Sequence, residues 1–176
     1  MGARIEAVGP GVVAAEHDVL VALLTDVVDG GASIGFLPPL SRDEASEFWR
    51  GVAAAVTEGR RILYVARVDG TIVGSAQLDL VEKPNGRHRA EVIKVMVLER
   101  ARRAGIGRAL MLAIEEEARR RNRTTLVLDT RQSDPSERLY RSLGWQPAGV
   151  IPKYALNGDG GVDATVVYYK LLDGEA

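Results

Sequence analysis

Apolar and polar positions along the chain follow two periods, one typical of strands and one typical of helices, and their order predicts an α/β protein of the α+β type. A short strand is expected at residues 3–8, and amphipathic helices are expected at residues 15–28 and 41–57. Ser41 and Glu44 have the spacing of a capping box at the start of the second helix. Residues 30–40 should form the connection between the two helices.

An antiparallel meander of strands is predicted next. Residues 61–67 and 71–80 are rich in β-branched and apolar side chains, and the Asp69-Gly70 pair between them is a strong hairpin signal. A further turn at residues 84–86 leads into residues 90–98, which have the composition of a largely buried strand.

Helices and strands alternate in the second half of the chain. Helical spacing at residues 109–121 is followed by a strand at 124–130, a short helix at 135–143, and strands at 145–151 and 164–171. Because a helix separates the strand at 124–130 from the one at 90–98, these two strands should run parallel. We therefore expect one domain spanning residues 1–176, with a mixed central sheet of about seven strands flanked by about four helices on both faces.

Composition narrows the classes of function. The net charge is −1, from 23 basic and 24 acidic side chains, so there is no general electrostatic reason to expect nucleic acid or an anionic membrane as a partner. The chain has no cysteine, which excludes disulfides, thiolate metal sites and a cysteine nucleophile. The two histidines, His17 and His88, stand far apart, so no metal site is expected. The N-terminus lacks a secretory signal pattern, and a cytoplasmic location is expected.

The turn after residues 90–98 combines two glycines with the arginines Arg102, Arg103 and Arg108. Gly105 and Gly107 allow positive φ angles and close approach of a ligand to the backbone, and the first N–H groups of the following helix attract anions. An ordinary strand-to-helix turn with solvated arginines would show the same pattern. A Walker loop is excluded because Gly-Lys-Ser/Thr is missing, and a dinucleotide fingerprint is excluded because Leu110 stands where a third glycine is needed.

Two motifs resemble a known family. Arg102-x-x-Gly105-x-Gly107 is similar to the Arg/Gln-x-x-Gly-x-Gly/Ala signature of the GNAT superfamily of N-acetyltransferases, and Leu139-Tyr140-x-x-x-Gly144-Trp145 is similar to its Leu-Tyr-x-x-x-Gly-Phe motif. The order of the elements is also similar. The resemblance implies the GNAT fold, in which the strands on either side of the glycine-loop helix splay apart and hold the pantetheine arm of acetyl-CoA.

The resemblance also implies that acetyl-CoA is the co-substrate, with its pyrophosphate on the glycine-rich turn, and that no metal takes part. Main-chain groups of residues 96–98 would face the thioester carbonyl, and two serine hydroxyls would contact the CoA arm. The positions implied in acetyl-CoA binding are Met96, Val97, Leu98, Arg102, Arg103, Ala104, Gly105, Ile106, Gly107, Arg108, Ser133 and Ser136.

Acetyl transfer to an amine needs a group that removes a proton and a group that protonates the departing thiolate. Glu91 begins one strand and Asp129 ends the neighbouring one, so either carboxylate is a candidate base. Taken singly, Glu91 fits a solvated charge at the start of a strand equally well, and Asp129 fits a cap of the following turn equally well. Tyr140 is the candidate acid, and its alternative role is to anchor the short helix.

Several segments, 35–40, 88–91 and 128–130, are similar to the tabtoxin resistance acetyltransferases, a branch of the family that modifies a small β-lactam dipeptide toxin. In that branch, the residues that match Glu91 and Asp129 are implicated in deprotonating the substrate, and the one that matches Tyr140 in protonating the thiolate. The resemblance also places the connection at residues 30–40 beside the acceptor pocket. Plain core packing explains its apolar residues as well as a role as pocket walls does; these residues are Ile34, Phe36 and Leu37.

The expected function is transfer of an acetyl group from acetyl-CoA to a primary amine of a small molecule, such as an amino-acid-like or dipeptide-like toxin or antibiotic, by direct attack. Two alternatives stay open. One is an acyl-CoA-binding sensor without turnover, and the other is an acetyltransferase that acts on protein amines. The acceptor, the choice of main base between Glu91 and Asp129, and the oligomeric state also stay open, although the family resemblance implies a homodimer.

Overall fold

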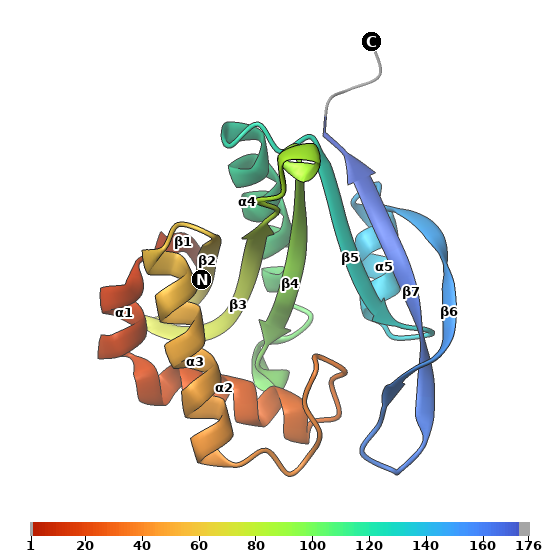
Figure 1. Ribbon diagram of the computed structural model, residues 1–176. Coiled ribbons are helices and arrows are strands. Elements are labelled where there is room, and N and C mark those ends of the chain that lie inside the picture. Colours follow the sequence, from red (N-terminus) through yellow and green to blue (C-terminus); the bar gives the residue numbers. More distant parts are fainter. Residues whose placement is uncertain (1, 173–176) are drawn as a thin grey trace.

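A seven-stranded mixed sheet forms the centre of the computed structural model, which describes residues 2–172. The strands are β1 Arg4–Val8, β2 Arg61–Val68, β3 Thr71–Leu80, β4 Arg89–Val97, β5 Thr125–Arg131, β6 Gln146–Leu156 and β7 Val162–Leu171, in the sheet order β1-β2-β3-β4-β5-β7-β6. The helices are α1 Pro10–Ala15, α2 His17–Asp29, α3 Arg42–Thr57, α4 Ile106–Arg120 and α5 Ser136–Ser142. Helices α1–α3 lie in front of strands β1–β4 and α4 lies behind them (Figure 1). The prediction of a mixed sheet covered on both faces is confirmed.

Local signals in the sequence account for several of these elements. Asp69 and Gly70 both have positive φ angles, of 49° and 81°, as a two-residue hairpin between β2 and β3 requires. The Ser41 hydroxyl accepts a hydrogen bond from the Glu44 amide, and the Glu44 carboxylate accepts one from the Ser41 amide, each at 3.2 Å. The predicted hairpin and capping box are therefore both present.

The first helical region differs from the prediction. One helix was expected at residues 15–28, but the chain forms α1 and α2, which are separated at Glu16, where φ is −111° and ψ is 25°. Pro10 begins α1 because its fixed φ suits the first position of a helix, where no N–H partner is needed. The described residues therefore contain five α-helices rather than about four.

The last hairpin is longer than expected. Strand β6 continues to Leu156, beyond the predicted end at Ile151, and passes through Pro152. Because β6 is the edge strand of the sheet, a residue that lacks an N–H is tolerated there. This extension brings the turn at residues 157–161 close to the connection between α2 and α3.

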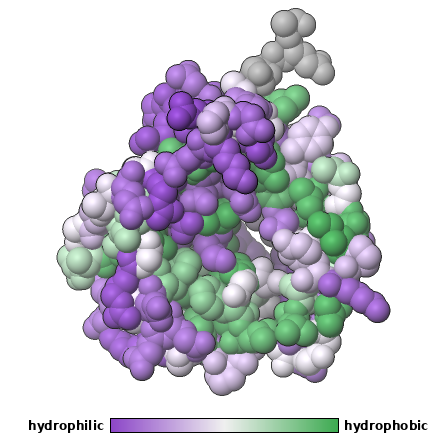
Figure 2. All heavy atoms as spheres, viewed as in Figure 1, coloured by the Kyte–Doolittle hydropathy of each residue, from purple (hydrophilic) through white to green (hydrophobic). Residues whose placement is uncertain are grey.

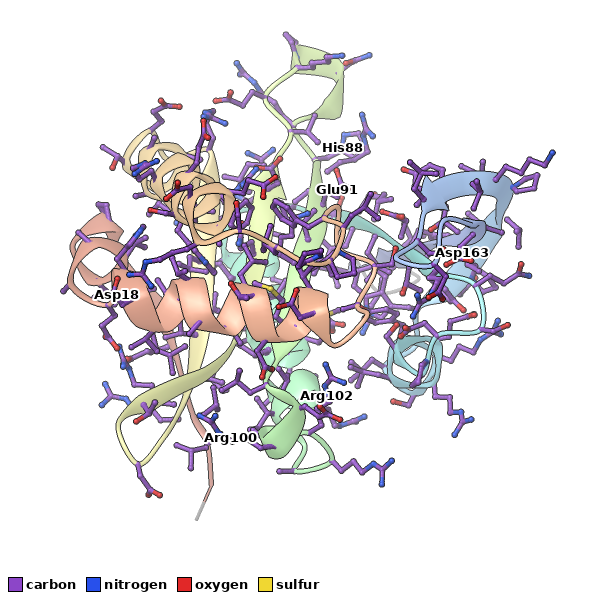
Figure 3. All side chains as sticks on the ribbon, turned by 90° about the horizontal axis from the view of Figure 1, so that it is seen from below. Asp18, His88, Glu91, Arg100, Arg102 and Asp163 are labelled. Atoms are coloured by element: carbon purple, nitrogen blue, oxygen red, sulfur yellow. The ribbon has the colours of Figure 1, made fainter. Side chains whose placement is uncertain are left out.

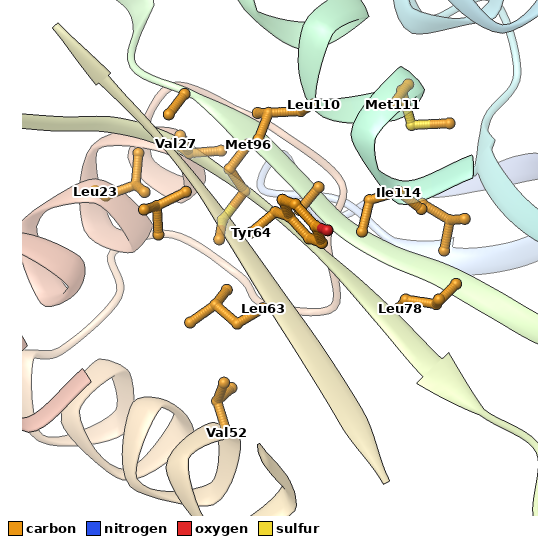
Figure 4. Packing of buried hydrophobic residues seen from close by; sticks show 14 of the residues in the cluster. Leu23, Val27, Val52, Leu63, Tyr64, Leu78, Met96, Leu110, Met111 and Ile114 are labelled. Carbon is orange, nitrogen blue, oxygen red and sulfur yellow. The ribbon is translucent and has the colours of Figure 1, made fainter. Parts of the chain in front are cut away.

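Apolar side chains fill both faces of the sheet. Leu63 of β2 packs toward α2 and α3, whereas its neighbour Tyr64 points to the other face, toward Ile114 of α4 (Figure 4). The side chains at the centre of both layers are less than 2% exposed; among them are Leu23, Trp49, Leu63, Leu78, Met96, Leu110 and Ile114. The first four strands are therefore packed on both faces.

Strands β4 and β5 separate soon after they begin. Their parallel pairing covers three residue pairs and ends at Glu91 and Val127, although β4 continues to Val97 and β5 to Arg131. The expected crossover and splay are both present. Beyond Glu91 the edge of β4 that faces β5 has no strand partner, and this opening is the site described next.

Candidate active site

The space between the separated strands is a cleft of about 920 Å³. Its walls come from β4, the start of α4, β5, α5, the β6–β7 hairpin and the connection between α2 and α3. The surface is hollowed between the half that carries β4 and the half that carries β6 and β7 (Figure 2). Segments that are far apart in the sequence therefore surround one cavity.

One end of the cleft is the N-terminus of α4. The first intrahelical hydrogen bond at this end runs from the Ala109 amide to the Gly105 carbonyl at 3.0 Å, so the amides of residues 106–108 precede the ladder of bonds. Arg102, Arg103 and Arg108 line the same part of the cleft. Unpaired amides, the helix dipole and arginine side chains together form a binding place for a phosphate group.

The two glycines of this turn are needed for different structural reasons. Gly105 is the N-cap of α4 and has a φ of 77°, a conformation that side chains rarely adopt. A Cβ at Gly107 would lie 3.3 Å from Leu139 Cδ2, so the missing side chain lets α5 pack beside the start of α4. Gly105 thus shapes the turn, and Gly107 brings the helix that carries Tyr140 close to it.

Most of the residues expected at the CoA arm line the cleft, but three do not. Leu98 is buried and its amide donates to the Val73 carbonyl at 2.9 Å, so it is occupied within the sheet. Ala104 also lies outside the lining, and Ser133 borders a separate hollow of about 430 Å³ between α5 and β6. Ser136 does line the cleft, where its hydroxyl lies 2.8 Å from Thr130 Oγ1. The remaining expected residues, Met96, Val97, Arg102, Arg103, Gly105, Ile106, Gly107 and Arg108, line the cleft.

The candidate bases lie toward the other end. Glu91 and Arg102 occupy opposite ends of β4 and its following turn (Figure 3). Glu91 pairs with Val127 in the sheet, and Asp129 lies two residues further along β5, so the two carboxylates share one face. The Thr165 hydroxyl lies 2.8 Å from Asp129 Oδ2 and can donate a hydrogen bond to it.

The surroundings of Glu91 affect its pKa in opposite directions. Its side chain is open to the cleft on one side, yet the cleft walls remove part of its hydration. This burial raises the pKa of Glu91 above its usual range, and the Asp129 carboxylate raises it further. Lys94 and Arg61 act in the opposite direction. A carboxyl group with a raised pKa is better suited to take a proton than an ordinary surface glutamate.

Tyr140 lies on α5 and forms part of the cleft wall. Its ring packs against Trp145 and Tyr168, with centroids 6.3 and 6.0 Å away, and its side chain is 6% exposed. Burial raises the pKa of Tyr140 above that of an ordinary phenol, so the hydroxyl keeps its proton. The structure therefore offers a protonated donor at a fixed position in the cleft.

The three residues expected as acceptor walls have different surroundings. Ile34 lines the cleft. Phe36 packs edge-on against Phe48 of α3, with ring centroids 5.4 Å apart, and lies outside the lining. Leu37 is 46% exposed and lies outside the lining. Of the three, Ile34 alone therefore reaches the cavity.

Sequence reasoning missed several residues of the cleft. Lys94 of β4 is the most prominent, and a single charge within the apolar run at residues 92–98 was the signal for it. Tyr154, Asp163 and Thr165 of the β6–β7 hairpin also line the cleft. No local pattern marks these three, because they reach the site through the pairing of β7 with β5 and of β6 with β7.

Two loops from opposite halves of the molecule meet beside the cleft. A Cβ at Gly158, in the turn between β6 and β7, would lie 2.7 Å from Pro38 Cγ, in the connection between α2 and α3. The two loops are therefore in direct contact. The contact crosses from one half of the molecule to the other, and neither residue belongs to the lining of the cleft itself.

Among residues 2–172, no group of three or more His, Asp or Glu side chains is arranged to hold a metal ion. Within the same range, no helix is long and apolar enough to cross a membrane.

Comparison with known proteins agrees with this geometry. The sequence profile described as "Acetyltransferase (GNAT) family" matches residues 31–145. An uncharacterized N-acetyltransferase from the hisH-hisA intergenic region of Azospirillum brasilense is 37% identical over 119 residues, which cover 66% of this chain and 68% of that protein. An N-alpha-acetyltransferase of Sulfurisphaera tokodaii is 31% identical over 105 residues, which cover 54% of this chain and 63% of that protein.

Solved structures share the fold. An N-acetyltransferase from Staphylococcus aureus Mu50 has a TM-score of 0.82 with 18% identity, and the match covers 98% of this chain and 100% of the other. The structure of yncA from Salmonella typhimurium with its cofactor acetyl-CoA has a TM-score of 0.80 with 21% identity, covering 100% of this chain and 97% of the other. The matching profile, the relatives and the splayed sheet lead to one conclusion: this chain belongs to the acetyltransferase (GNAT) family.

Proposed function

We propose that the protein transfers an acetyl group from acetyl-CoA to a primary amine of a small molecule. The observation that carries the proposal is the cleft between β4 and β5, which has a phosphate-binding helix terminus at one end, carboxylates at the other and Tyr140 in its wall. Acetyl-CoA supplies the thioester, and its arm fits beside the unpaired edge of β4. Membership of the family supports the same donor.

The chemistry follows from the positions of the side chains. The amine nitrogen attacks the thioester carbonyl carbon, a C–N bond forms and the C–S bond breaks. Glu91 or Asp129 takes the proton that the nitrogen loses, directly or through water, and Tyr140 donates a proton to the departing sulfur of CoA. The products are an N-acetyl amide and free CoA thiol. With no cysteine in the chain, a direct transfer needs no thioester on the protein.

A small acceptor is favoured because the contact between Gly158 and Pro38 joins the two halves of the molecule beside the cleft and narrows the approach to it from that side. The similarity of residues 35–40 and 88–91 to the tabtoxin resistance acetyltransferases favours an amino-acid-like or dipeptide-like amine. A protein N-terminus is the second candidate acceptor, since one relative is described as an N-alpha-acetyltransferase.

The test measures release of CoA thiol from acetyl-CoA with a panel of small primary amines and with peptides that have free N-termini. We expect turnover with at least one small amine, and losses of about 10²-fold or more in Asp129→Asn and Tyr140→Phe. Turnover with peptides alone would favour the protein acetyltransferase. Binding of CoA in a calorimeter without thiol release on any amine would favour a sensor and overturn the proposal.

A further inference from the structure

Lys94 occupies an irregular position in the middle of β4. Gln77 pairs with Ile93 and Ser75 pairs with Met96, so Lys94 and Val95 together face a single residue of β3. This is a β-bulge, and Lys94 has a φ of 52°, a conformation that a residue with a side chain rarely adopts. A Cβ at Gly74, across the bulge, would lie 2.7 Å from Met96 O, so glycine is needed there. The sheet is locally distorted where Lys94 enters the cleft.

The ammonium of Lys94 is held by aromatic rings and by one carbonyl. It lies 5.5 Å from the ring centre of Phe36 and 5.9 Å from that of Phe48, and it donates a hydrogen bond to the Ile34 carbonyl. An ammonium has three N–H donors. Within residues 2–172, that carbonyl is its one hydrogen-bond acceptor, and no carboxylate lies within 4.0 Å of its nitrogen. A partly buried cation with unused donors lacks its natural partner, an anion.

The other cations around the cleft are accounted for. Arg102, Arg103 and Arg108 belong to the phosphate end. Arg131 lies 3.4 Å from Asp134 and 3.7 Å from Asp163, so its charge is balanced by carboxylates. Lys94 is therefore the cation that remains for an acceptor on the side of the cleft bordered by residues 30–35.

The surroundings of Lys94 also show that its charge is sensitive to its partners. Burial lowers the pKa of Lys94, and the nearby Arg61 lowers it further, whereas Asp129 and Glu91 raise it. An anion bound at the ammonium would favour the charged form in the same way as the two carboxylates do. Binding of an anionic group and retention of the proton on Lys94 therefore support each other.

We propose that Lys94 binds a carboxylate of the acceptor, so that the acceptor is an amino-acid-like molecule that carries an amine and a carboxylate a short distance apart. This inference rests on the proposed acetyltransferase function and names the class of its acceptor. Glu91 and Asp129 receive the ammonium end, and Lys94 receives the anionic end. An amine without a carboxylate leaves Lys94 unpaired and is a poorer acceptor.

The test compares free L-amino acids with their α-carboxamides, which keep the amine and lack the negative charge. Release of CoA thiol is measured for each pair in the wild type and in Lys94→Gln, Lys94→Arg and Lys83→Gln. In the wild type we expect kcat/KM to be about 10- to 100-fold higher for the acid of an accepted pair than for its amide. The ratio should fall to near one in Lys94→Gln and persist in Lys94→Arg. Lys83, an exposed lysine outside the cleft, is the matched control and should leave the ratio unchanged.

The outcomes separate this inference from the proposed function. If acids and amides react equally well in the wild type, or if Lys94→Gln slows both to the same extent, Lys94 only tethers residue 34 and the carboxylate site is overturned while the acetyltransferase stands. If no amine releases CoA in any variant, the proposed function itself fails. Calorimetric titration of Lys94→Gln with CoA checks that the variant is folded and that its donor end is intact.

Discussion

The Lys170 ammonium on β7 lies 2.7 Å from the Glu115 carboxylate on α4, and the Glu115 side chain is 2% exposed. The other carboxylate oxygen of Glu115 accepts a hydrogen bond from Trp145 Nε1 at 2.9 Å, and Lys170 also donates to the Leu143 carbonyl at 2.5 Å. This buried group of contacts joins the main half of the sheet to the half that carries α5. It thereby fixes Tyr140 relative to the cleft.

Removal of the cation from this pair should be severely destabilising. Lys170→Met leaves Glu115 buried without a counter-charge, and the free energy of unfolding should fall by about 3–5 kcal/mol in urea denaturation. The double variant Lys170→Met, Glu115→Leu should recover part of this loss, because no buried charge remains. Arg42→Met, which breaks the exposed pair with Asp18, is the control and should cost much less. A loss in Lys170→Met no larger than in this control would contradict the assignment.

Loss of the Tyr140 hydroxyl should slow the chemical step. Tyr140→Phe keeps the ring that packs against Trp145 and Tyr168, so the fold should be retained. Release of CoA thiol at saturating acetyl-CoA should be about 10²-fold slower or more, because the departing sulfur has lost its proton donor. Tyr169→Phe removes a hydroxyl that bonds Gln146 on the outer surface and should leave the rate unchanged. Equal rates in the two variants would assign Tyr140 to packing alone.

Two neighbours should move the pKa of Glu91 in opposite directions. Asp129→Asn removes a repelling charge and should lower it, whereas Lys94→Gln removes an attracting charge and should raise it. The shifts can be measured by ¹³C NMR titration of protein labelled at glutamate, with the resonance assigned by its loss in Glu91→Gln. Asp18→Asn, on the exposed surface of α2, is the control. The same titration midpoint in all variants would mean that these charges do not face Glu91.

The raised pKa of Glu91 also predicts how stability changes with pH. The folded state binds this proton more tightly than the unfolded chain does, so the contribution of Glu91 to stability is complete at low pH. It is lost as the pH rises from 4.5, the pKa of an ordinary glutamate, through the higher pKa of Glu91 in the folded state. The free energy of unfolding of Glu91→Gln minus that of the wild type should therefore be larger at about pH 7 than at about pH 4, as measured by urea denaturation. A difference that does not change with pH would contradict the shift.

Gly105→Ala should weaken the binding of CoA more than its effect on stability explains. Alanine at a φ of 77° costs about 1 kcal/mol, and relief of this strain would move the amides at the start of α4. Calorimetry should show weaker binding of CoA but unchanged binding of pantetheine, which lacks the pyrophosphate. Gly59→Ala, at a φ of 73° far from the cleft, should cost similar stability without affecting CoA. Equal losses for CoA and pantetheine would place the pyrophosphate elsewhere.

Where periodicity, turn residues and motif agreed, the sequence was a sufficient guide. The hairpin at Asp69-Gly70, the cap at Ser41 and the positive φ at Gly105 all depend on a few neighbouring residues. The short helix α1 was missed because its six residues hold too few turns to show a period. Lys94 was missed because its position depends on a bulge, which follows from pairing with β3 and not from β4 itself.

The part of the site formed by β4 and β5 could be predicted from the sequence, whereas the part formed by the β6–β7 hairpin could not. Glu91 and Asp129 were placed on neighbouring strands from the element order, and the structure puts both in one cleft. Ser133 stands at a motif position but turns to the other side of α5, where its amide donates to Glu137 at 2.7 Å. Contacts between Pro38 and Gly158 join loops that are 120 positions apart in the chain, and no local pattern encodes them.

Because the pairing between β4 and β5 ends early, the sheet consists of two parts, β1–β4 and β5–β7, that are joined over a short distance. Three residue pairs join the two parts in the sheet, and side-chain contacts such as the one between Glu115 and Lys170 join them elsewhere. A molecule bound between the two parts would supply hydrogen-bond partners to the unpaired edge of β4. It would also fix the position of one part relative to the other. Ligand binding should therefore reduce local opening of the protein. Amides of residues 92–97 would exchange with solvent more slowly in the ligand-bound protein than in the free protein.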